Sequence, residues 1–430
     1  MSRLLLRGGR VVDPALGRDG SFDVLVADGT VEEVGPRLAA RGAQVLDLKG
    51  LVVCPGFIDI HTHLREPGCE DKETIATGTR AAAAGGYTAV CAMPNTDPVN
   101  DTAGITRAIL EKAAAEGAVR VYPIAAITRG QQGQELAEMG ELREAGCVAV
   151  SDDGRPVASA RVMRRALEYA KAFGLVVIDH CEEPTLAEKA CMNEGKVSTL
   201  LGLRGQPAAG EAIVVERDVL LAELTGGRIH IAHLSAAASV DAVRRGKRRG
   251  VAVTAEATPH HLFLTDEAVR ESGYDTNTKM NPPLRSEADR QAVVAGLRDG
   301  TIDCIATDHA PHTVDDKKVE YDVAANGVVG LETAVALCLD RLVGAGSLEL
   351  PQLVSLLSTN PARVLGLPGG TLAPGSPADV TVLDLTRKRQ VDPERFESRS
   401  RNTPFGGWIL KGWPAMTIVG GRVAWRDARP

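Results

Sequence analysis

The middle of the chain alternates short apolar runs with longer stretches of helical periodicity, and this alternation limits the folds available to it. The apolar runs are rich in Val, Ile and Ala, as expected of buried strands. Strands that alternate with helices predict a parallel sheet with helices packed outside it. The candidate strands are residues 56–61, 87–93, 120–127, 147–151, 175–179, 228–233, 251–255 and 304–307.

Eight strand-helix units predict an α/β fold of the (β/α)8 TIM-barrel type, which typically needs about 250 residues. An open, doubly wound sheet is the alternative architecture. No Gly-x-Gly-x-x-Gly opens a helix after a strand, which removes the dinucleotide-binding form of that alternative. The clearest helical stretches are residues 73–84, 102–116, 158–173, 211–224 and 287–299.

The two ends of the chain contain short strands separated by turn residues. We expect them at residues 4–12, 22–27, 30–34, 379–384 and 417–425. Neither end buries much surface by itself, so we expect the ends to pair into one small β-sandwich. The predicted domains are therefore a composite β-sandwich from residues 1–53 and 367–430, and a catalytic barrel from residues 54–366.

Composition excludes several classes of partner. The formal net charge of −7 argues against nucleic acid or an anionic membrane, because both call for a basic surface. The eight cysteines are scattered without a Cys-x-x-Cys pair, which is typical of reduced thiols in the cytoplasm. No apolar run has the length of a signal peptide core or a membrane span, so we expect a cytoplasmic protein.

A pair of histidines marks the end of the first candidate strand of the barrel. Positions i and i+2 of a strand point to the same side, so His61 and His63 project together. Neutral imidazoles are good zinc ligands. An isolated His-x-His is more often a polar rim than a metal site, so the pair needs support from other strands.

Other strand ends supply that support. Barrel enzymes place their catalytic groups at the carboxyl ends of the strands. Asp152-Asp153-Gly154 follows the fourth strand, His180 the fifth, His233 the sixth and Asp308 the eighth. Each residue taken singly could be structural, but together they predict a metal site inside one cavity.

Four motifs resemble the bacterial class I dihydroorotases of the amidohydrolase superfamily. Residues 55–63, Pro-Gly-Phe-Ile-Asp-Ile-His-Thr-His, resemble the opening metal motif of that superfamily. The four motifs that resemble class I dihydroorotases are residues 63–68, 92–96, 279–285 and 306–312, and the resemblance covers essentially the whole chain.

The resemblance implies a set of metal ligands. His61, His63 and Asp308 hold one zinc, His180 and His233 hold a second, and Asp153 bridges the two. Hydantoinases and allantoinases, which are related cyclic amidohydrolases, use a carboxylated lysine at the bridging position. The aspartate here is similar to the class I dihydroorotase pattern, and it leaves open whether one or two zinc ions bind.

The resemblance also implies substrate contacts and a catalytic base. The substrate is N-carbamoyl-L-aspartate or L-dihydroorotate, and the fork-shaped Arg65 guanidinium suits its carboxylate. Asp308 is the expected base. The other expected contacts are His63, Asn95, Asn281, His312, Asn326 and Gly327. Asn326, just before Gly327, departs from the aromatic or small apolar residue that is usual in the family at this position.

We therefore expect a zinc-dependent dihydroorotase of pyrimidine synthesis. The alternatives are another cyclic amide hydrolase, such as a hydantoinase or allantoinase, and an inactive scaffold for aspartate transcarbamoylase. We expect a homo-oligomer, and family analogy suggests a complex with aspartate transcarbamoylase. We expect His260 and His261 to pack at the rim of the barrel without binding the metal, and His230 to lie in the core or face a helix.

Overall fold

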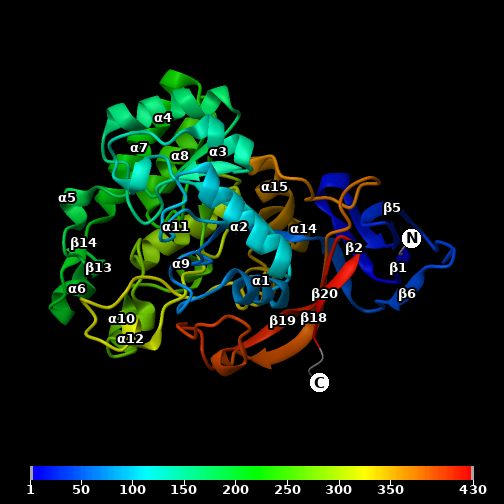
Figure 1. The fold of residues 1–430 in the computed structure, drawn as a ribbon. Helices are drawn as coiled ribbons and strands as arrows, with labels where there is room; N and C mark the ends of the chain where they lie inside the picture. Colours follow the sequence, from blue (N-terminus) through cyan, green and yellow to red (C-terminus); the bar gives the residue numbers. More distant parts are fainter. Residues whose placement is uncertain (1–2, 428–430) are drawn as a thin grey trace.

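Figure 1 shows the computed structural model, which describes residues 3–427. It contains the predicted parallel sheet. Its strand order is β17-β16-β15-β12-β11-β10-β9-β8, and neighbouring strands are parallel. The eight strands are β8 (Phe57–Thr62), β9 (Tyr87–Ala92), β10 (Arg120–Ala125), β11 (Ala149–Ser151), β12 (Val176–Asp179), β15 (Ile229–Ile231), β16 (Val253–Ala257) and β17 (Cys304–Ile305). All eight lie at predicted positions, which confirms the α/β barrel architecture.

The first strand and the segment after the last one meet, which brings the sheet close to a closed barrel. Thr62 and His309 form an isolated parallel bridge, and the His63 N–H donates to the His309 carbonyl at 2.9 Å. The carboxyl ends of β8 and β17 therefore lie side by side.

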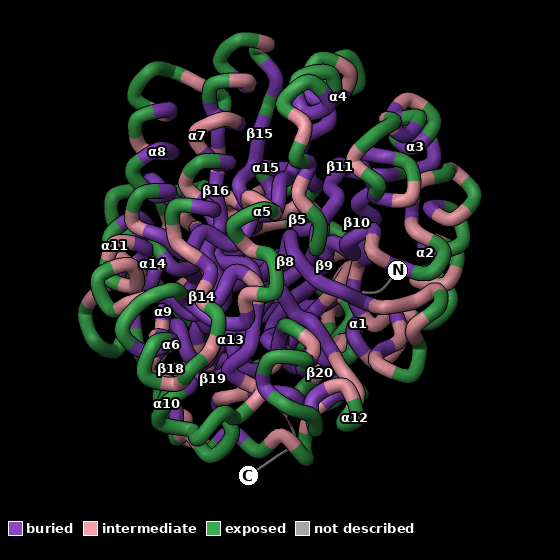
Figure 2. Tube along the Cα trace, turned by 90° about the vertical axis from the view of Figure 1, so that its left-hand side faces the viewer, coloured by how far each residue is buried: buried purple, intermediate pink, exposed green. Residues whose placement is uncertain are grey.

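Helices surround the sheet and separate its strands along the chain. The helices that follow barrel strands are α1 (Ile75–Ala84), α2 (Ala103–Glu116), α3 (Met139–Ala145), α4 (Ala160–Ala172), α7 (Ala208–Thr225), α8 (Ala237–Arg248) and α11 (Glu287–Arg298). Figure 2 shows the labelled barrel strands as buried, whereas α4, α7 and α8 also expose residues on their outer sides. The helices thus shield an apolar sheet from water.

Shorter elements fill the loops at the carboxyl ends of the strands and complete the barrel. After β12 and β16 the loops carry α5 (Pro184–Ala187), β13 (Met192–Asn193), α6 (Lys196–Leu201), β14 (Gly205–Gln206), α9 (Pro259–Phe263) and α10 (Glu267–Glu271). After β17 come α12 (Val314–Lys317), α13 (Ala334–Cys338), α14 (Leu350–Val354) and α15 (Asn360–Leu365).

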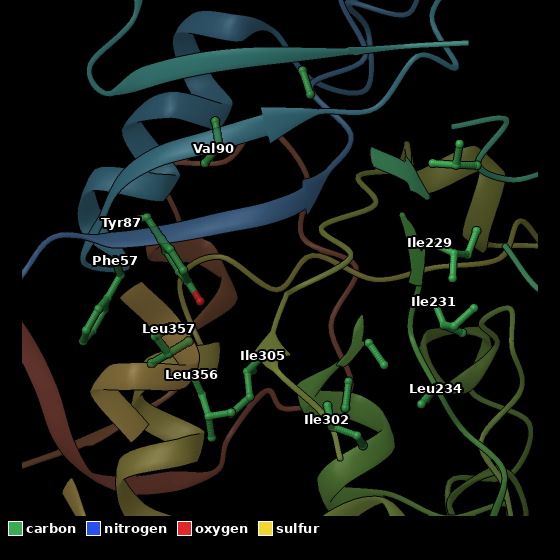
Figure 3. Packing of buried hydrophobic residues seen from close by; sticks show 14 of the residues in the cluster. Phe57, Tyr87, Val90, Ile229, Ile231, Leu234, Ile302, Ile305, Leu356 and Leu357 are labelled. Carbon is green, nitrogen blue, oxygen red and sulfur yellow. The ribbon is translucent and has the colours of Figure 1, made fainter. Parts of the chain in front are cut away.

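The main core lies between the sheet and its helices. Phe57 and Tyr87 begin β8 and β9 and pack edge to face, with ring centroids 6.3 Å apart. Leu356 and Leu357, next to α14, belong to the same apolar cluster (Figure 3). This packing holds the strands whose far ends carry the polar residues discussed below.

The two ends of the chain form two further sheets. One has the order β5-β4-β1-β6, from β1 (Arg3–Arg7), β4 (Asp23–Ala27), β5 (Thr30–Gly35) and β6 (Gln44–Asp47). The other has the order β20-β19-β18-β7-β2-β3, from β2 (Arg10–Asp13), β3 (Arg18–Ser21), β7 (Val52–Pro55), β18 (Val380–Gln390), β19 (Ile409–Val419) and β20 (Arg422–Arg426). Side chains from both sheets, such as Leu6, Val24, Val380 and Ile418, share one apolar cluster.

Two predicted terminal strands are each divided in the structure. The predicted strand 4–12 breaks after Arg7, so β1 and β2 enter different sheets, and the predicted strand 417–425 turns back between β19 and β20. Gly8, Gly420 and Gly421 have φ values of +75°, +55° and +74°. Glycine adopts this left-handed backbone without steric cost, so both breaks fall at Gly-Gly pairs.

The remaining global expectations concern cysteines and membrane helices. All eight cysteines are free, and only Cys69 is not buried. No helix within residues 3–427 is long and apolar enough to cross a membrane.

Candidate metal and active site

His61 and His63 leave the end of β8 with their rings 5.5 Å apart, centroid to centroid. Their Nε2 atoms lie 3.5 Å and 3.0 Å from Oδ1 of Asp308, which follows β17. The proximity of these three residues follows from the meeting of β8 with the segment after β17. Asp308 has a φ of +48°, a strained backbone for a residue other than glycine.

Asp153 lies at the centre of the remaining predicted ligands. Its Oδ1 is 3.3 Å from His61 Nε2, 3.6 Å from His233 Nε2 and 3.8 Å from His180 Nδ1. Its Oδ2 is 3.5 Å from His63 Nε2. One carboxylate thus faces four histidines from three different strand ends, which is the placement that a bridging ligand needs.

Asp152, by contrast, faces away from this cluster. Its Oδ1 accepts hydrogen bonds from the backbone N–H groups of Ile127 and Thr128 at 2.8 and 3.0 Å, and the Thr128 hydroxyl donates to its other oxygen. Asp152 therefore supports the loop after β10, and Asp153 alone of the pair is available as a ligand.

Three buried atoms in this cluster have no hydrogen-bond partner within residues 3–427: His61 Nε2, His233 Nδ1 and Asp153 Oδ1. His61 Nε2 and Asp153 Oδ1 lie 3.3 Å apart. Two overlapping triads, His61-His63-Asp308 and His61-Asp153-His233, each bring three ligand atoms within 4.8 Å of one another. Buried polar atoms are rarely left unpaired, and imidazole with carboxylate is a common metal donor set. The residues fit a bound divalent cation.

The charges of the cluster reinforce one another. Burial alone would lower the pKa of His61, but Asp153, Glu256 and Asp308 raise that pKa well above its usual 6.5. Burial alone would raise the pKa of Asp308, and the neighbouring histidines His61 and His63 lower it below its usual value instead. The carboxylates are therefore ionised and able to attract a cation.

Glu256 on β16 is a functional residue that the sequence analysis missed. Its Oε1 lies 2.5 Å from His61 Nδ1, and it accepts from the His233 N–H at 3.3 Å. Its Oε2 lies 3.2 Å from Nε2 of His230, whose Nδ1 lies 2.8 Å from the Thr254 hydroxyl. Glu256 directly follows the expected strand 251–255, and a carboxylate at that position is the same signal that identified the other candidate ligands.

The contact with Glu256 defines the orientation of His61. A carboxylate that accepts from Nδ1–H leaves the Nε2 lone pair free for a metal. Burial alone would raise the pKa of Glu256, but the imidazoles of His61 and His230 lower it to about 2, so the acceptor is charged. His230, expected in the core, is fully buried and extends this chain of hydrogen bonds.

We expect Glu256→Gln to weaken metal binding about 10- to 100-fold, because the His61 imidazole loses its charged acceptor. Competition with a chromogenic chelator measures that affinity. Glu332→Gln is the control, since Glu332 accepts from the backbone N–H groups of Glu397 and Ser398 away from the cluster. Equal metal affinity in the two variants would contradict a role for Glu256 in orienting His61.

Two of the expected substrate contacts lie beside the cluster. The Asn95 side-chain oxygen lies 2.8 Å from His63 Nδ1, so the same histidine presents Nε2 to Asp308. Arg65 has a φ of +63°, and its Nε donates to the Pro311 carbonyl at 3.2 Å. Within residues 3–427 no carboxylate forms an ion pair with Arg65, so its terminal nitrogens remain available for an anionic ligand.

Glu66, the neighbour of Arg65, is engaged elsewhere. Its Oε2 accepts from the Ile75 N–H at 2.8 Å, at the start of α1, and its Oε1 is 3.4 Å from Lys112 Nζ. The Glu66 carboxylate is therefore not the partner of the Arg65 guanidinium.

The other expected contacts come from two loops. Asn281 Nδ2 donates to Glu182 at 2.7 Å and approaches His180 Nε2 at 3.2 Å. His312 Nε2 donates to the Asn326 carbonyl at 2.7 Å. His312 therefore supports the loop that carries Asn326 and Gly327.

Two further histidines, His261 and His309, are hydrogen-bonded outside the ligand cluster, whereas His260 Nε2 is buried without a hydrogen-bond partner within residues 3–427. His261 approaches the Thr258 hydroxyl at 2.7 Å and the Pro282 carbonyl at 2.9 Å. Its ring lies 4.5 Å from that of His260, centroid to centroid. His309 lies 3.3 Å from Glu73 and accepts from the Gly330 N–H.

The barrel and its cluster together define the class of protein: a parallel α/β barrel whose strand ends carry His and Asp side chains that are able to hold a metal. Two family models match the chain, Dihydro-orotase-like over residues 50–239 and Amidohydrolase family over residues 211–424. A dihydroorotase from Pelotomaculum thermopropionicum is 57% identical over 99% of both chains. Another, from Anaeromyxobacter dehalogenans, is 56% identical over 99% of this chain and 98% of its own.

The chain belongs to the dihydroorotase family, within the amidohydrolases. Among solved structures, an L-hydantoinase (dihydropyrimidinase) from Arthrobacter aurescens superposes with a TM-score of 0.90 at 25% identity, over 100% of this chain and 97% of its own. A D-hydantoinase (dihydropyrimidinase) from Thermus sp. has a TM-score of 0.83 at 27% identity, over 99% and 96%. The barrel with an additional β unit is thus shared with other cyclic amidohydrolases.

Proposed function

We propose that this chain catalyses the reversible cyclisation of N-carbamoyl-L-aspartate to L-dihydroorotate in de novo pyrimidine synthesis. It is a hydrolase that acts on cyclic amides, and its full-length relatives are named dihydroorotases. The observation that supports this reaction best is the convergence of His61, His63, Asp308 and Asp153 in a buried cluster, with Arg65 beside it.

The proposed cofactor is Zn²⁺, as one or two ions. Imidazole and carboxylate ligands suit zinc. His61, His63 and Asp308 would hold one ion, His180 and His233 would complete a second site, and Asp153 would serve both. A bound zinc ion lowers the pKa of water and polarises a carbonyl group.

Asp308 is the proposed proton carrier. In hydrolysis, its carboxylate takes a proton from the attacking water and delivers it to the ring nitrogen as the amide C–N bond breaks. In ring closure, Asp308 takes a proton from the carbamoyl nitrogen as that nitrogen attacks the side-chain carboxyl, and it gives this proton to the hydroxyl group that leaves as water as the C–O bond breaks. The neighbouring histidines lower the pKa of Asp308 and so keep its carboxylate in the ionised form, which is the form that can accept a proton.

Recognition depends on a charged anchor and polar contacts to the ring. The free terminal nitrogens of Arg65 suit a bidentate pair with the substrate carboxylate. Asn95 contacts His63, and Asn281 approaches His180 from the loop after α10. His312, Asn326 and Gly327 are the proposed contacts from the loop after β17.

Two alternatives lead to different expectations. Hydantoinases and allantoinases carry a carboxylated lysine where this chain has Asp153, which favours the dihydroorotase reaction. An inactive scaffold for a transcarbamoylase has no use for a complete ligand set, and all six ligand positions here carry His or Asp.

A substrate panel tests this proposal. The purified zinc-loaded chain receives L-dihydroorotate, hydantoin and dihydrouracil, and ultraviolet absorbance follows ring opening. We expect turnover of dihydroorotate to exceed the others at least about a hundredfold in kcat/KM, because only dihydroorotate offers a carboxylate to Arg65. Preference for an uncharged ring would favour a hydantoinase-like enzyme. Absence of turnover with all three substrates would favour the inactive scaffold.

A further inference from the structure

The loop formed by residues 324–327 is held by its carbonyl groups, and each of its four carbonyls accepts a hydrogen bond from a side chain. The Ala324 oxygen accepts from Lys279 Nζ at 2.7 Å, and the Ala325 oxygen from Lys317 Nζ at 2.8 Å. The Asn326 oxygen accepts from His312. The Gly327 oxygen accepts from Lys317 Nζ at 3.1 Å and from Asn402 Nδ2 at 3.2 Å.

Two buried lysines at this position need an explanation. Lys279 and Lys317 are 5% and 8% exposed. Burial, together with the charge of Lys279, lowers the pKa of Lys317 to about 7. Burying an ammonium group is unfavourable unless its donors are satisfied, and here backbone carbonyls satisfy them. Neither lysine has a role in the reaction as derived above.

Asn402 joins this loop to the second part of the molecule, since it lies between β18 and β19. Its Nδ2 also donates to the Ala310 carbonyl at 3.0 Å, and its Oδ1 accepts from the His312 N–H at 3.2 Å. Its own carbonyl accepts from the Val329 N–H at 2.9 Å. One buried side chain therefore links both sides of the loop after β17.

Holding the carbonyls determines where the N–H groups point. The C=O and N–H of a trans peptide point in opposite directions. The Ala325 carbonyl faces Lys317, so the Asn326 N–H faces the other way, and it has no hydrogen-bond partner within residues 3–427. Gly327 has a φ of +110°, and a Cβ there would lie 2.5 Å from that of Ala310, so the chain turns closely at this point.

We propose that Lys317, with Lys279 and Asn402, is a positioning residue that orients the 324–327 backbone so that its free N–H meets an oxygen of the anionic substrate. This inference rests on the proposed function, in which Asn326 and Gly327 contact the substrate. The lysines do not touch the reacting atoms. They act through the peptide groups that they hold.

The test compares Lys317→Met, which keeps an unbranched stem but removes the ammonium, with Lys318→Met. Lys318 is the next residue, and it is exposed. We expect KM for L-dihydroorotate to rise about tenfold in Lys317→Met with kcat changed less than about threefold, because ground-state binding is lost while the metal cluster is intact. Lys318→Met should match the wild type. An unchanged KM, or a kcat loss equal to the loss in kcat/KM, would overturn the proposal.

Hydrogen-deuterium exchange provides a readout that is independent of activity. Peptides covering residues 318–328 should exchange faster in Lys317→Met than in Lys318→Met, with equal metal content. Asn402→Ala should also speed exchange in residues 318–328, and it replaces Lys317→Met in this test if Lys317→Met does not fold. If the wild type does not turn over dihydroorotate, the proposed function is contradicted. Hydrogen-deuterium exchange still tests whether Lys317 holds the 324–327 loop in place. Unchanged exchange in both variants would overturn the positioning role itself.

Discussion

Asp308→Asn is expected to abolish nearly all turnover of L-dihydroorotate while the protein stays folded. An amide in place of the carboxylate cannot accept the proton from the attacking water, and loss of a general base typically costs about 10²- to 10⁴-fold in rate. The change is nearly isosteric and the backbone φ of +48° suits asparagine as well as aspartate. Steady-state kinetics in both directions, with circular dichroism and elemental analysis of the same sample, measure the effect.

The matched control is Asp315→Asn on α12. Asp315 is exposed, and its carboxylate forms no hydrogen bond or ion pair within residues 3–427. Both variants lose one negative charge from the same loop region. Loss of activity in both would therefore indicate that the lost charge, and not the lost base, lowers turnover. Near-normal kcat in a metal-replete Asp308→Asn protein would show that another group carries the proton.

Removal of the metal is the second change with a large expected effect. After chelation and dialysis, we expect less than about 1% of the original turnover, because neither the lowered pKa of water nor the polarised carbonyl is then available. Zn²⁺ should restore activity at one or two equivalents. Parallel additions of Mn²⁺, Co²⁺ and Mg²⁺ identify the preferred ion, and full activity of the metal-free chain would exclude the proposed cofactor.

Asp153→Ala separates the one-ion and two-ion forms of this proposal. Asp153 approaches His61, His233 and His180 with one oxygen and His63 with the other. Its removal should lower the zinc content measured by elemental analysis, since two groups of histidines lose their shared carboxylate. Unchanged zinc content in Asp153→Ala would contradict the bridging role.

Much of the fold could be predicted because barrel strands and helices are encoded locally. An apolar run of β-branched residues followed by a helical stretch predicts a strand and its helix, and all eight barrel strands lie where that pattern indicates. The strand predictions for the two ends of the chain were less accurate. A Gly-Gly pair reads as part of a strand in a sequence, whereas the positive φ of Gly8 becomes apparent only when β1 and β2 are seen in different sheets.

The proposed metal ligands could be predicted for a related reason. In a parallel barrel every strand ends at the same rim, so a polar residue after a strand is directed to one cavity wherever it lies in the sequence. His61 and Asp308 are far apart along the chain, yet the strand rule alone places them together.

The supporting contacts obey no such rule, because they depend on which side chains happen to meet behind the rim. Glu256 approaches His61 across the barrel interior, and Lys317 reaches two carbonyls of its own loop. Asn402 reaches that loop from the segment between two strands of another sheet. The sequence by itself determined the barrel and the residues that face its cavity, since both follow from local periodicity. Only the tertiary structure decided how those residues are oriented, since orientation comes from packing between distant segments.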